Sequence, residues 1–264
     1  MLMSITDIIV ESYRLYKNNV KKFFPYILLT FIPSALIVIA RFILTYFAPG
    51  ASLGTIGLSF LSFLLVALLL SAVGFWFSIA FIRVIANAYT GKTSGSIGSE
   101  LGTAKKIFWP AVGVTILTAL AVLGGMILLI IPGIIFMLWF AFSYASVTID
   151  NTGVMESLHK SKALVDGRWW NVFWRLVIPG LALGILVYVI IDIVSFPTDY
   201  VLKHTNPSSS LYSIWLVVGE IIISFFTALL TPLTTIAMVI LYFELKKTPH
   251  TAPTPQMTSP ESLS

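Results

Sequence analysis

The sequence predicts an all-α integral membrane protein, a bundle of six transmembrane helices. Only 10% of its 264 residues are charged and 58% are hydrophobic, and the mean hydropathy is +0.96. A soluble domain is about a quarter charged, so the main solvent of this chain is lipid and not water. Two further observations agree. The apolar residues form runs long enough to cross a bilayer, and the basic residues lie between alternate runs.

The first two predicted spans are residues 24–47 and 55–82. Each is apolar over more than the ~20 residues that a helix needs to cross the hydrocarbon core. Pro33 lies inside the first span, where neighbouring helices can satisfy the carbonyl group that a proline leaves without a donor. We therefore expect a kink at Pro33 and not a break.

Spans three and four, residues 107–130 and 134–149, belong to one long run without any charge. As a single helix the run would be ~65 Å long, about twice the thickness of the hydrocarbon core. Pro132 removes a backbone donor and Gly133 tolerates the dihedral angles of a turn. We predict a tight hairpin at this pair; a kinked re-entrant segment is the alternative.

Spans five and six are residues 170–196 and 211–243. Pro179 and Pro232 lie inside them and predict kinks, for the reason given for the first span. The six spans together make one membrane domain, residues 1–247.

The basic residues predict which ends of the spans face the cytoplasm. Most basic residues lie on one predicted side of the membrane: before span one, between spans two and three, beside spans four and five, and after span six. They are Arg14, Lys17, Lys21, Lys22, Arg83, Lys92, Lys105, Lys106, Lys160, Lys162, Arg168, Arg175, Lys246 and Lys247. The opposite side has Lys203, with Arg41 approaching it from within a span. This bias predicts a multi-pass protein of the cell (inner, cytoplasmic) membrane with both termini in the cytoplasm, as an even number of spans requires. Basic loops also account for the pI near 9.4, so no nucleic-acid partner is expected.

The last residues, 248–264, differ in composition from the rest of the chain. They are rich in Pro, Ser and Thr and too polar to fold alone. We predict a disordered cytoplasmic tail.

Three cytoplasmic segments resemble one another, and each precedes a pair of spans. Apolar residues fall on one helical face within 5–20, 97–108 and 154–169, and the junctions that follow read KKFFP (21–25), KKIFWP (105–110) and GRWWNVFW (167–174). We predict three repeats of an amphipathic interfacial helix plus a transmembrane hairpin. The alternative is that any cytoplasmic membrane boundary is basic and aromatic. Since cations meet phosphates there and tryptophan rings suit the boundary, the candidate lipid-headgroup contacts are Lys21, Lys22, Lys105, Lys106, Arg168, Trp109, Trp169 and Trp170.

Three charges fall inside predicted spans, where charge is expensive: Arg41, Asp192 and Glu220. The predicted topology puts all three in the outer half of the bilayer, so we expect one intramembrane polar cluster. It would be a structural ion pair that locks spans one, five and six. The alternatives are a polar pocket or ion path that opens outward, and unrelated side chains that reach the interface.

No catalytic constellation is visible in the sequence. Residues 50–54 fit G-x-S-x-G and residues 86–93 resemble a P-loop, but neither follows a strand as those motifs require. The chain has no cysteine, which excludes thiolate ligands and nucleophiles. Charged and polar side chains surround the helix after span four, and a solvated face explains them better than a metal site: Asp150, Asn151, Glu156, His159, Lys160 and Asp166. We expect no enzymatic activity, no metal and no cofactor.

The stretch IIPGIIFMLWFAFSYASVTIDNTGVMESLHKSKALVDGRWWNVFWRLV, residues 130–177, resembles the membrane domain of some prokaryotic glycerophosphoryl diester phosphodiesterases and of related six-span proteins of unknown function. The LYFELKK ending, 241–247, is also similar. In the fused enzymes a separate soluble barrel carries out the hydrolysis, and this chain contains no such domain. The resemblance therefore implies a membrane partner module and supplies no catalytic residue.

These observations predict a non-enzymatic membrane module. Its interfacial helices would engage anionic lipid headgroups, and its bundle or tail would hold a membrane or cytoplasmic partner protein. The alternative is a transporter of a lipid or lipid-derived solute that uses the intramembrane charges as an outer-leaflet polar pocket.

Overall fold

The structure is a computed structural model that describes residues 2–47 and 52–248. Throughout these two segments the regular structure is helical, with no strand. The helices are α1 (Ile5–Phe47), α2 (Leu53–Tyr89), α3 (Ile97–Leu128), α4 (Ile130–Trp139), α5 (Ser143–Asp150), α6 (Val154–Val165), α7 (Trp169–His204) and α8 (Ser210–Lys247). Apart from Thr248, the predicted tail lies outside the described residues.

Within the described segments, six stretches are long and apolar enough to cross a membrane: α1, α2, α3, α4 continued by α5, α7 and α8. They follow the order of the predicted spans, so the predicted all-α fold class is confirmed and the helices are those of a multi-pass membrane protein. The helices continue through Pro33, Pro179 and Pro232, as the sequence predicted.

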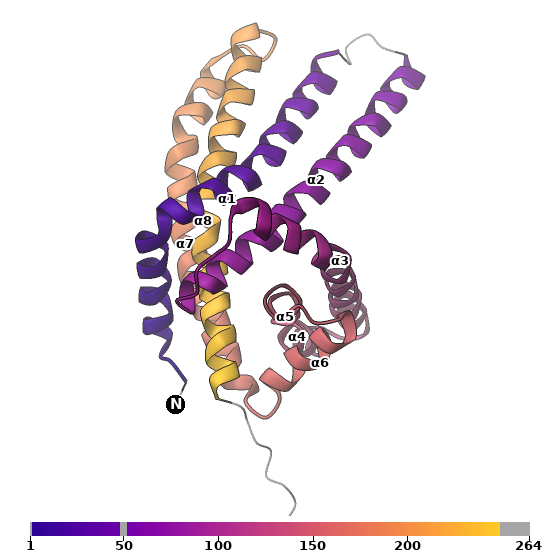
Figure 1. The fold of residues 1–264 in the computed structure, drawn as a ribbon. Coiled ribbons are helices and arrows are strands. Elements are labelled where there is room, and N and C mark those ends of the chain that lie inside the picture. The colour runs from indigo at the N-terminus through magenta and orange to yellow at the C-terminus, as the bar shows by residue number, and fades with distance from the viewer. Residues whose placement is uncertain (1, 48–51, 249–264) are drawn as a thin grey trace, which may run out of the picture.

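The helices are arranged as hairpins beside α8 (Figure 1). In the upper half of the view, α1 and α2 form one hairpin and α7 and α8 form another, and α1 packs against both α2 and α8. Below them, α3 contacts α2, α4, α5 and α6. The N-terminus lies at the same end of the molecule as the C-terminal end of α8.

The buried core lies where the hairpins meet, near that end of the molecule. It takes its largest fully buried side chains from the N-terminal part of α1, the C-terminal parts of α2 and α8, and the segment around α4 and α5: Ile8, Phe23, Ile27, Ile79, Ile85, Leu138, Phe142, Ile236, Ile240, Leu241, Tyr242 and Leu245. In contrast, the most apolar 18-residue stretch of α2 contains no buried residue, and only 6% of the residues in the corresponding stretch of α8 are buried. The outer parts of the hairpins therefore present apolar side chains to their surroundings, as lipid-facing helices do.

The turn between α3 and α4 occurs at Leu129 and not at the Pro-Gly pair. Leu129 is extended (φ −162°, ψ 149°), and Pro132 lies in the first turn of α4, where a missing N–H costs little. A Cβ on Gly133 would lie 2.9 Å from the backbone nitrogen of Met126, and one on Gly125 would lie 2.9 Å from the Cα of Gly133. The hairpin between the two spans is present, but Gly133 serves the close packing of α3 on α4 and not the turn.

Span four was expected to be one helix and is instead broken between α4 and α5. The backbone groups freed by the break are satisfied by Ser161 of α6. Its hydroxyl donates to the carbonyl of Trp139 at 2.6 Å and accepts from the N–H of Phe142 at 3.0 Å. A break at membrane depth is tolerated when protein groups replace the lost helical hydrogen bonds.

The predicted interfacial helices differ in how they join the spans. The first two amphipathic segments are the N-terminal parts of α1 and α3, and only the third, α6, is a separate helix. An unbroken helix satisfies its own backbone groups through the membrane boundary, whereas Gly167 adopts a left-handed φ of 74° between α6 and α7 and ends the third segment.

Candidate functional site

An ion pair joins α1 to α8 in the half of the bundle away from the two described chain ends. Nη2 of Arg41 donates to Oε1 of Glu220, and the two side chains are 52% and 33% exposed. Asp192 is exposed on α7 and pairs with neither of them. The structure therefore brings together two of the three intramembrane charges of the predicted cluster and leaves the third outside it.

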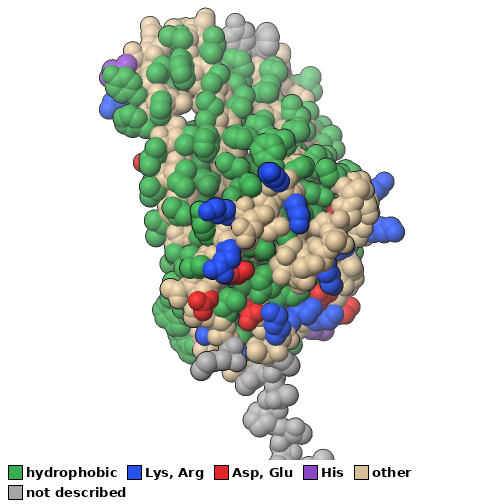
Figure 2. Space-filling view, turned by 60° about the vertical axis from the view of Figure 1, so that its left-hand side comes forward, with side chains coloured by type: hydrophobic (Ala, Val, Ile, Leu, Met, Phe, Trp, Pro, Cys, Tyr) green, Lys and Arg blue, Asp and Glu red, His purple; other side chains and the backbone are tan. Residues whose placement is uncertain are grey.

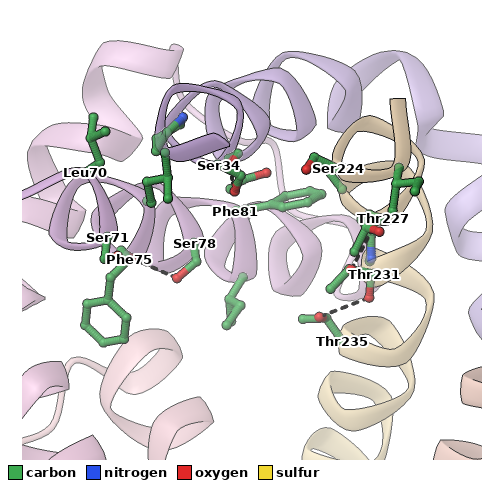
Figure 3. Close-up of a pocket in the computed structure, with 18 of the residues that line it drawn as sticks. Ser34, Leu70, Ser71, Phe75, Ser78, Phe81, Ser224, Thr227, Thr231 and Thr235 are labelled. Atoms are coloured by element: carbon green, nitrogen blue, oxygen red, sulfur yellow. Dashed lines mark hydrogen bonds between the residues drawn. The ribbon is translucent and has the colours of Figure 1, made fainter. Parts of the chain in front are cut away.

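A cavity of about 690 Å³ lies between α1, α2 and α8. It is one helical turn away from this ion pair, toward the end of the molecule that holds the N-terminus. Ile37, one turn before Arg41, lines it from α1, and Ser224, one turn after Glu220, lines it from α8. Figure 3 shows hydroxyl side chains around this space: Ser34, Ser71, Ser78, Ser224, Thr227, Thr231 and Thr235. No charged residue lines the cavity. We call this space the hydroxyl cavity.

The hydroxyl groups of this cavity mainly offer acceptors. Several donate their one hydrogen to a carbonyl of their own helix, at 2.7 to 3.4 Å: Thr30, Ser34, Ser78, Thr231 and Thr235. Such back-bonding occupies the donor and leaves the oxygen lone pairs available. A ligand that fits these groups must bring O–H or N–H donors.

At the other end of the molecule, four of the predicted headgroup lysines are exposed. Lys21 and Lys22 lie on α1, and Lys105 and Lys106 lie on α3. Trp109 and Trp170 are also exposed, at 75% and 63%. Figure 2 shows Lys and Arg side chains gathered over the lower half of the face drawn, while the upper half is largely hydrophobic. We use the name basic–aromatic surface for the four exposed lysines and two exposed tryptophans: Lys21, Lys22, Lys105, Lys106, Trp109 and Trp170.

The other two predicted headgroup contacts have structural partners. Trp169 stacks on Phe173, and its Nε1 is buried without a hydrogen-bond partner in the described part of the chain. Arg168 donates to the carbonyl of Leu164 at 2.8 Å, to that of Leu245 at 2.9 Å, and to Thr248 at the C-terminal end of α8. Burial lowers the pKa of Arg168, yet a guanidinium keeps its charge in proteins. Arg168 therefore ties the end of α8 to the start of α7.

A buried polar network that the sequence analysis missed joins α2, α3 and α5. Glu100 is 7% exposed, and its carboxylate lies 3.4 Å from Nε of Arg83. Nη1 of Arg83 donates to the carbonyl of Thr148 at 2.9 Å and to Oδ1 of Asn151 at 2.8 Å. The N–H of Gly95 donates to Glu100 at 3.2 Å. These partners are far apart in the sequence, so no local pattern indicates the network.

The polar residues after span four do not act as one group. Asp150 accepts from the hydroxyl of Tyr242 at 2.8 Å and pairs with Lys246 of α8 at 2.8 Å. Glu156 pairs with Lys160 along α6, and the hydrogen bond from Lys160 lowers the pKa of Glu156. Asp150 therefore fastens α5 to α8, while the pair on α6 lies at the surface.

The two catalytic-looking motifs were expected to be ordinary chain features. Residues 86–93 form the last turn of α2 and the loop after it, with Gly91 at a φ of 70°. The first two residues of the other motif, 50–54, lie outside the described residues.

A family model for a domain of unknown function, DUF7847, matches residues 59–245. The chain belongs to this family. The matched region of this DUF7847 chain runs from within α2 almost to the end of α8 and includes Glu220, Asp192, Lys105 and Lys106, whereas Arg41 precedes it. Comparison with curated proteins and with solved structures finds no match.

One signal in the sequence could have revealed the hydroxyl cavity. Ser224, Thr227, Thr231 and Thr235 recur at spacings of three and four, which places their hydroxyls on one face of an otherwise apolar helix. In contrast, nothing local indicates that α1 and α2 supply the opposite walls. The pairing of Arg41 with Glu220 follows from the same arrangement.

Proposed function

We propose that this chain is a non-enzymatic membrane module that engages anionic lipid through the basic–aromatic surface and holds a partner protein. The proposed lipid binding rests on one observation. Four lysines are exposed next to aromatic residues at two predicted helix–membrane junctions: Lys21, Lys22, Lys105 and Lys106. None of the four forms an ion pair with a residue in 2–47 or 52–248. Each lysine near an anionic membrane surface contributes ~1 kcal/mol to binding.

The proposed orientation places both termini in the cytoplasm of a prokaryotic cell, with the chain in its cytoplasmic membrane. The gathering of Lys and Arg side chains at one end supports this orientation, because cytoplasmic loops carry most of the basic residues. The resemblance of residues 130–177 to the membrane domain of glycerophosphoryl diester phosphodiesterases supports a partner role. In those enzymes the membrane domain accompanies a separate catalytic domain.

The lipid half is tested by replacing Lys21, Lys22, Lys105 and Lys106 together with Gln. The protein is purified gently in native-like lipid, and mass spectrometry gives the ratio of retained phosphatidylglycerol to phosphatidylcholine. We expect wild type to be enriched in the anionic lipid and the variant to lose that enrichment. Lys203→Gln, at the opposite end, is the control and should keep it. An unchanged ratio in the quadruple variant would contradict the proposal.

The same purification tests the partner half. We expect a protein to co-purify in stoichiometric amount with wild type. Recovery of this chain alone, under conditions that retain its lipid, would contradict that half.

A second candidate function is a carrier of a lipid or lipid-derived solute. The observation that favours it is the hydroxyl cavity within the apolar bundle, with the Arg41–Glu220 ion pair one turn beyond it. In vesicles with a fluorescent glucosyl lipid, wild type should speed the movement of the probe between leaflets, measured by its accessibility to an impermeant quencher. Arg41→Gln with Glu220→Gln should slow this movement, and Asp192→Asn, outside the pair, should not. Equal rates with and without the protein would contradict the carrier function.

A further inference from the structure

A second cavity adjoins the hydroxyl cavity and differs from it in chemistry. It has a volume of about 590 Å³, lies between α2, α3, α4 and α5, and is lined largely by apolar side chains such as Val114, Val122 and Met137. We call it the apolar cavity. Phe75, Ser78 and Tyr144 line both spaces, so these three residues lie between the two cavities.

The junction has a defined direction of hydrogen bonding. The Ser78 hydroxyl donates to the carbonyl of Phe75 at 2.7 Å, so the 3.0 Å contact between Ser78 and Tyr144 requires the phenol of Tyr144 to be the donor. Both hydrogens are then used, and the two oxygens keep lone pairs at the junction. The junction therefore offers acceptors, as the hydroxyls of α1 and α8 do.

The absence of charge from the walls limits the ligand further. No Asp, Glu, Lys, Arg or His is among the residues that line either cavity. A charged group in such a low-dielectric space would lack a counter-charge, which is costly. A ligand of these cavities is therefore uncharged, rich in hydroxyl donors at one end and apolar at the other.

We propose that the two cavities form one binding site for an uncharged, single-chain amphiphile with a polyhydroxyl head, such as a sugar-headed lipid. The head lies in the hydroxyl cavity and the hydrocarbon chain lies in the apolar cavity, with the linking region beside Ser78 and Tyr144. This site is separate from the basic–aromatic surface. Its biological use rests on the proposed carrier function and names the substrate class of that function, while binding is tested by itself.

The test uses the full chain in phosphatidylcholine nanodiscs, which contain no anionic lipid. The probe is an alkyl glucoside with a photoreactive diazirine in its chain, and mass spectrometry maps the labelled peptides. We expect labelling to concentrate on residues 114–122 of α3. Unlabelled alkyl glucoside should compete with the probe, and an alkyl methyl ether of equal chain length should compete far less.

Two pairs of variants decide between a specific site and general lipid contact. Ala119→Trp fills the apolar cavity and should reduce labelling at least fivefold, whereas Leu120→Trp, on the lipid-facing side of the same helix, should not. Ser78→Ala with Tyr144→Phe should weaken competition by the glucoside about tenfold and leave the ether unchanged. Thr103→Val, which removes an exposed hydroxyl outside both cavities, should have no effect.

Two results would overturn the site: labelling spread evenly over the lipid-facing helices, or equal competition by glucoside and ether. Specific labelling without faster movement of the glucosyl lipid in vesicles would instead overturn the carrier function and leave the site standing.

Discussion

Ser161 of α6 donates a hydrogen bond of 2.6 Å to the carbonyl of Trp139, the last residue of α4. The same oxygen accepts from the N–H of Phe142 before α5 begins. One side chain of the short helix α6 thus supplies the hydrogen-bond partners of two backbone groups at the break between α4 and α5. Ser161 therefore links the position of α6 to the break in span four.

Ser161→Ala should destabilise the fold by about 1–3 kcal/mol, because it leaves a buried donor and a buried acceptor without partners. Thermal unfolding in detergent, followed by circular dichroism, measures the effect. Ser62→Ala removes an exposed hydroxyl that donates to the carbonyl of Ser59 in its own helix, and it should change stability little. Equal stability of the two variants would show that the break does not depend on Ser161.

The close approach of α3 and α4 gives a second test at two neighbouring glycines. Gly125→Ala should destabilise the protein by about 1–3 kcal/mol, because the new Cβ would lie 2.8 Å from Phe136 and 2.9 Å from the backbone of Gly133. Gly124 has open space around it, so Gly124→Ala should stabilise the helix by up to ~1 kcal/mol. The two midpoints of thermal unfolding should move in opposite directions; a shift of both in the same direction would argue against this packing.

The Arg83–Glu100 network should behave as a coupled unit. Glu100→Gln should cost about 3 kcal/mol of stability, since it leaves the partly buried guanidinium of Arg83 without its counter-charge. The exposed pair of Glu11 and Arg14 is the comparison, and Glu11→Gln should cost less than ~1 kcal/mol. Adding Arg83→Met to Glu100→Gln should recover part of the loss. Strictly additive effects of the two substitutions would contradict the coupling.

The proposed orientation can be read directly, because the chain has no cysteine to interfere. A single cysteine at Lys92, in the exposed loop after α2, should react with an impermeant maleimide only when the cytoplasmic side is accessible. A cysteine at Ser208, in the loop between α7 and α8, should react in intact cells. The reverse pattern would place the basic loops outside.

A conservative exchange tests whether Arg168 acts by its hydrogen-bonding geometry. Arg168→Lys keeps the charge but cannot reach the carbonyls of Leu164 and Leu245 and the Thr248 groups at once. We expect faster amide hydrogen exchange over the last turn of α8, with the rest of the helix unchanged. Lys162→Arg, on the exposed side of α6, should leave exchange as in wild type.

Some features of the fold could be predicted because they depend on composition and period alone. Hydrophobic runs of sufficient length must be helical in lipid, since every backbone group there needs an internal partner. Helices that continue through Pro33 and Pro179 were predicted for this reason. The predicted turn at Pro132 and Gly133 was misplaced by three residues, because a proline is equally suited to the first turn of a helix. The sequence pattern did not distinguish these two uses.

The candidate site also has some features that the sequence could predict and others that depend on tertiary packing. An intramembrane position of Arg41 and Glu220 is predicted from their apolar neighbours in the sequence, but their pairing with each other and not with Asp192 depends on how α1 lies against α8. Likewise, the serines and threonines of α8 have a visible period, while the cavity they face exists only because α1 and α2 stand opposite.

The sequence by itself determined that this chain is helical, that six of its stretches can cross a membrane, and where its charges lie along them, because solvation by lipid acts on each segment independently. Only the tertiary structure decided which helices pair, that span four breaks between Trp139 and Ser143 where Ser161 of α6 contacts it, and that Ser78 meets Tyr144 between two cavities. Those outcomes come from side-chain packing between segments far apart in the chain, which no local pattern records.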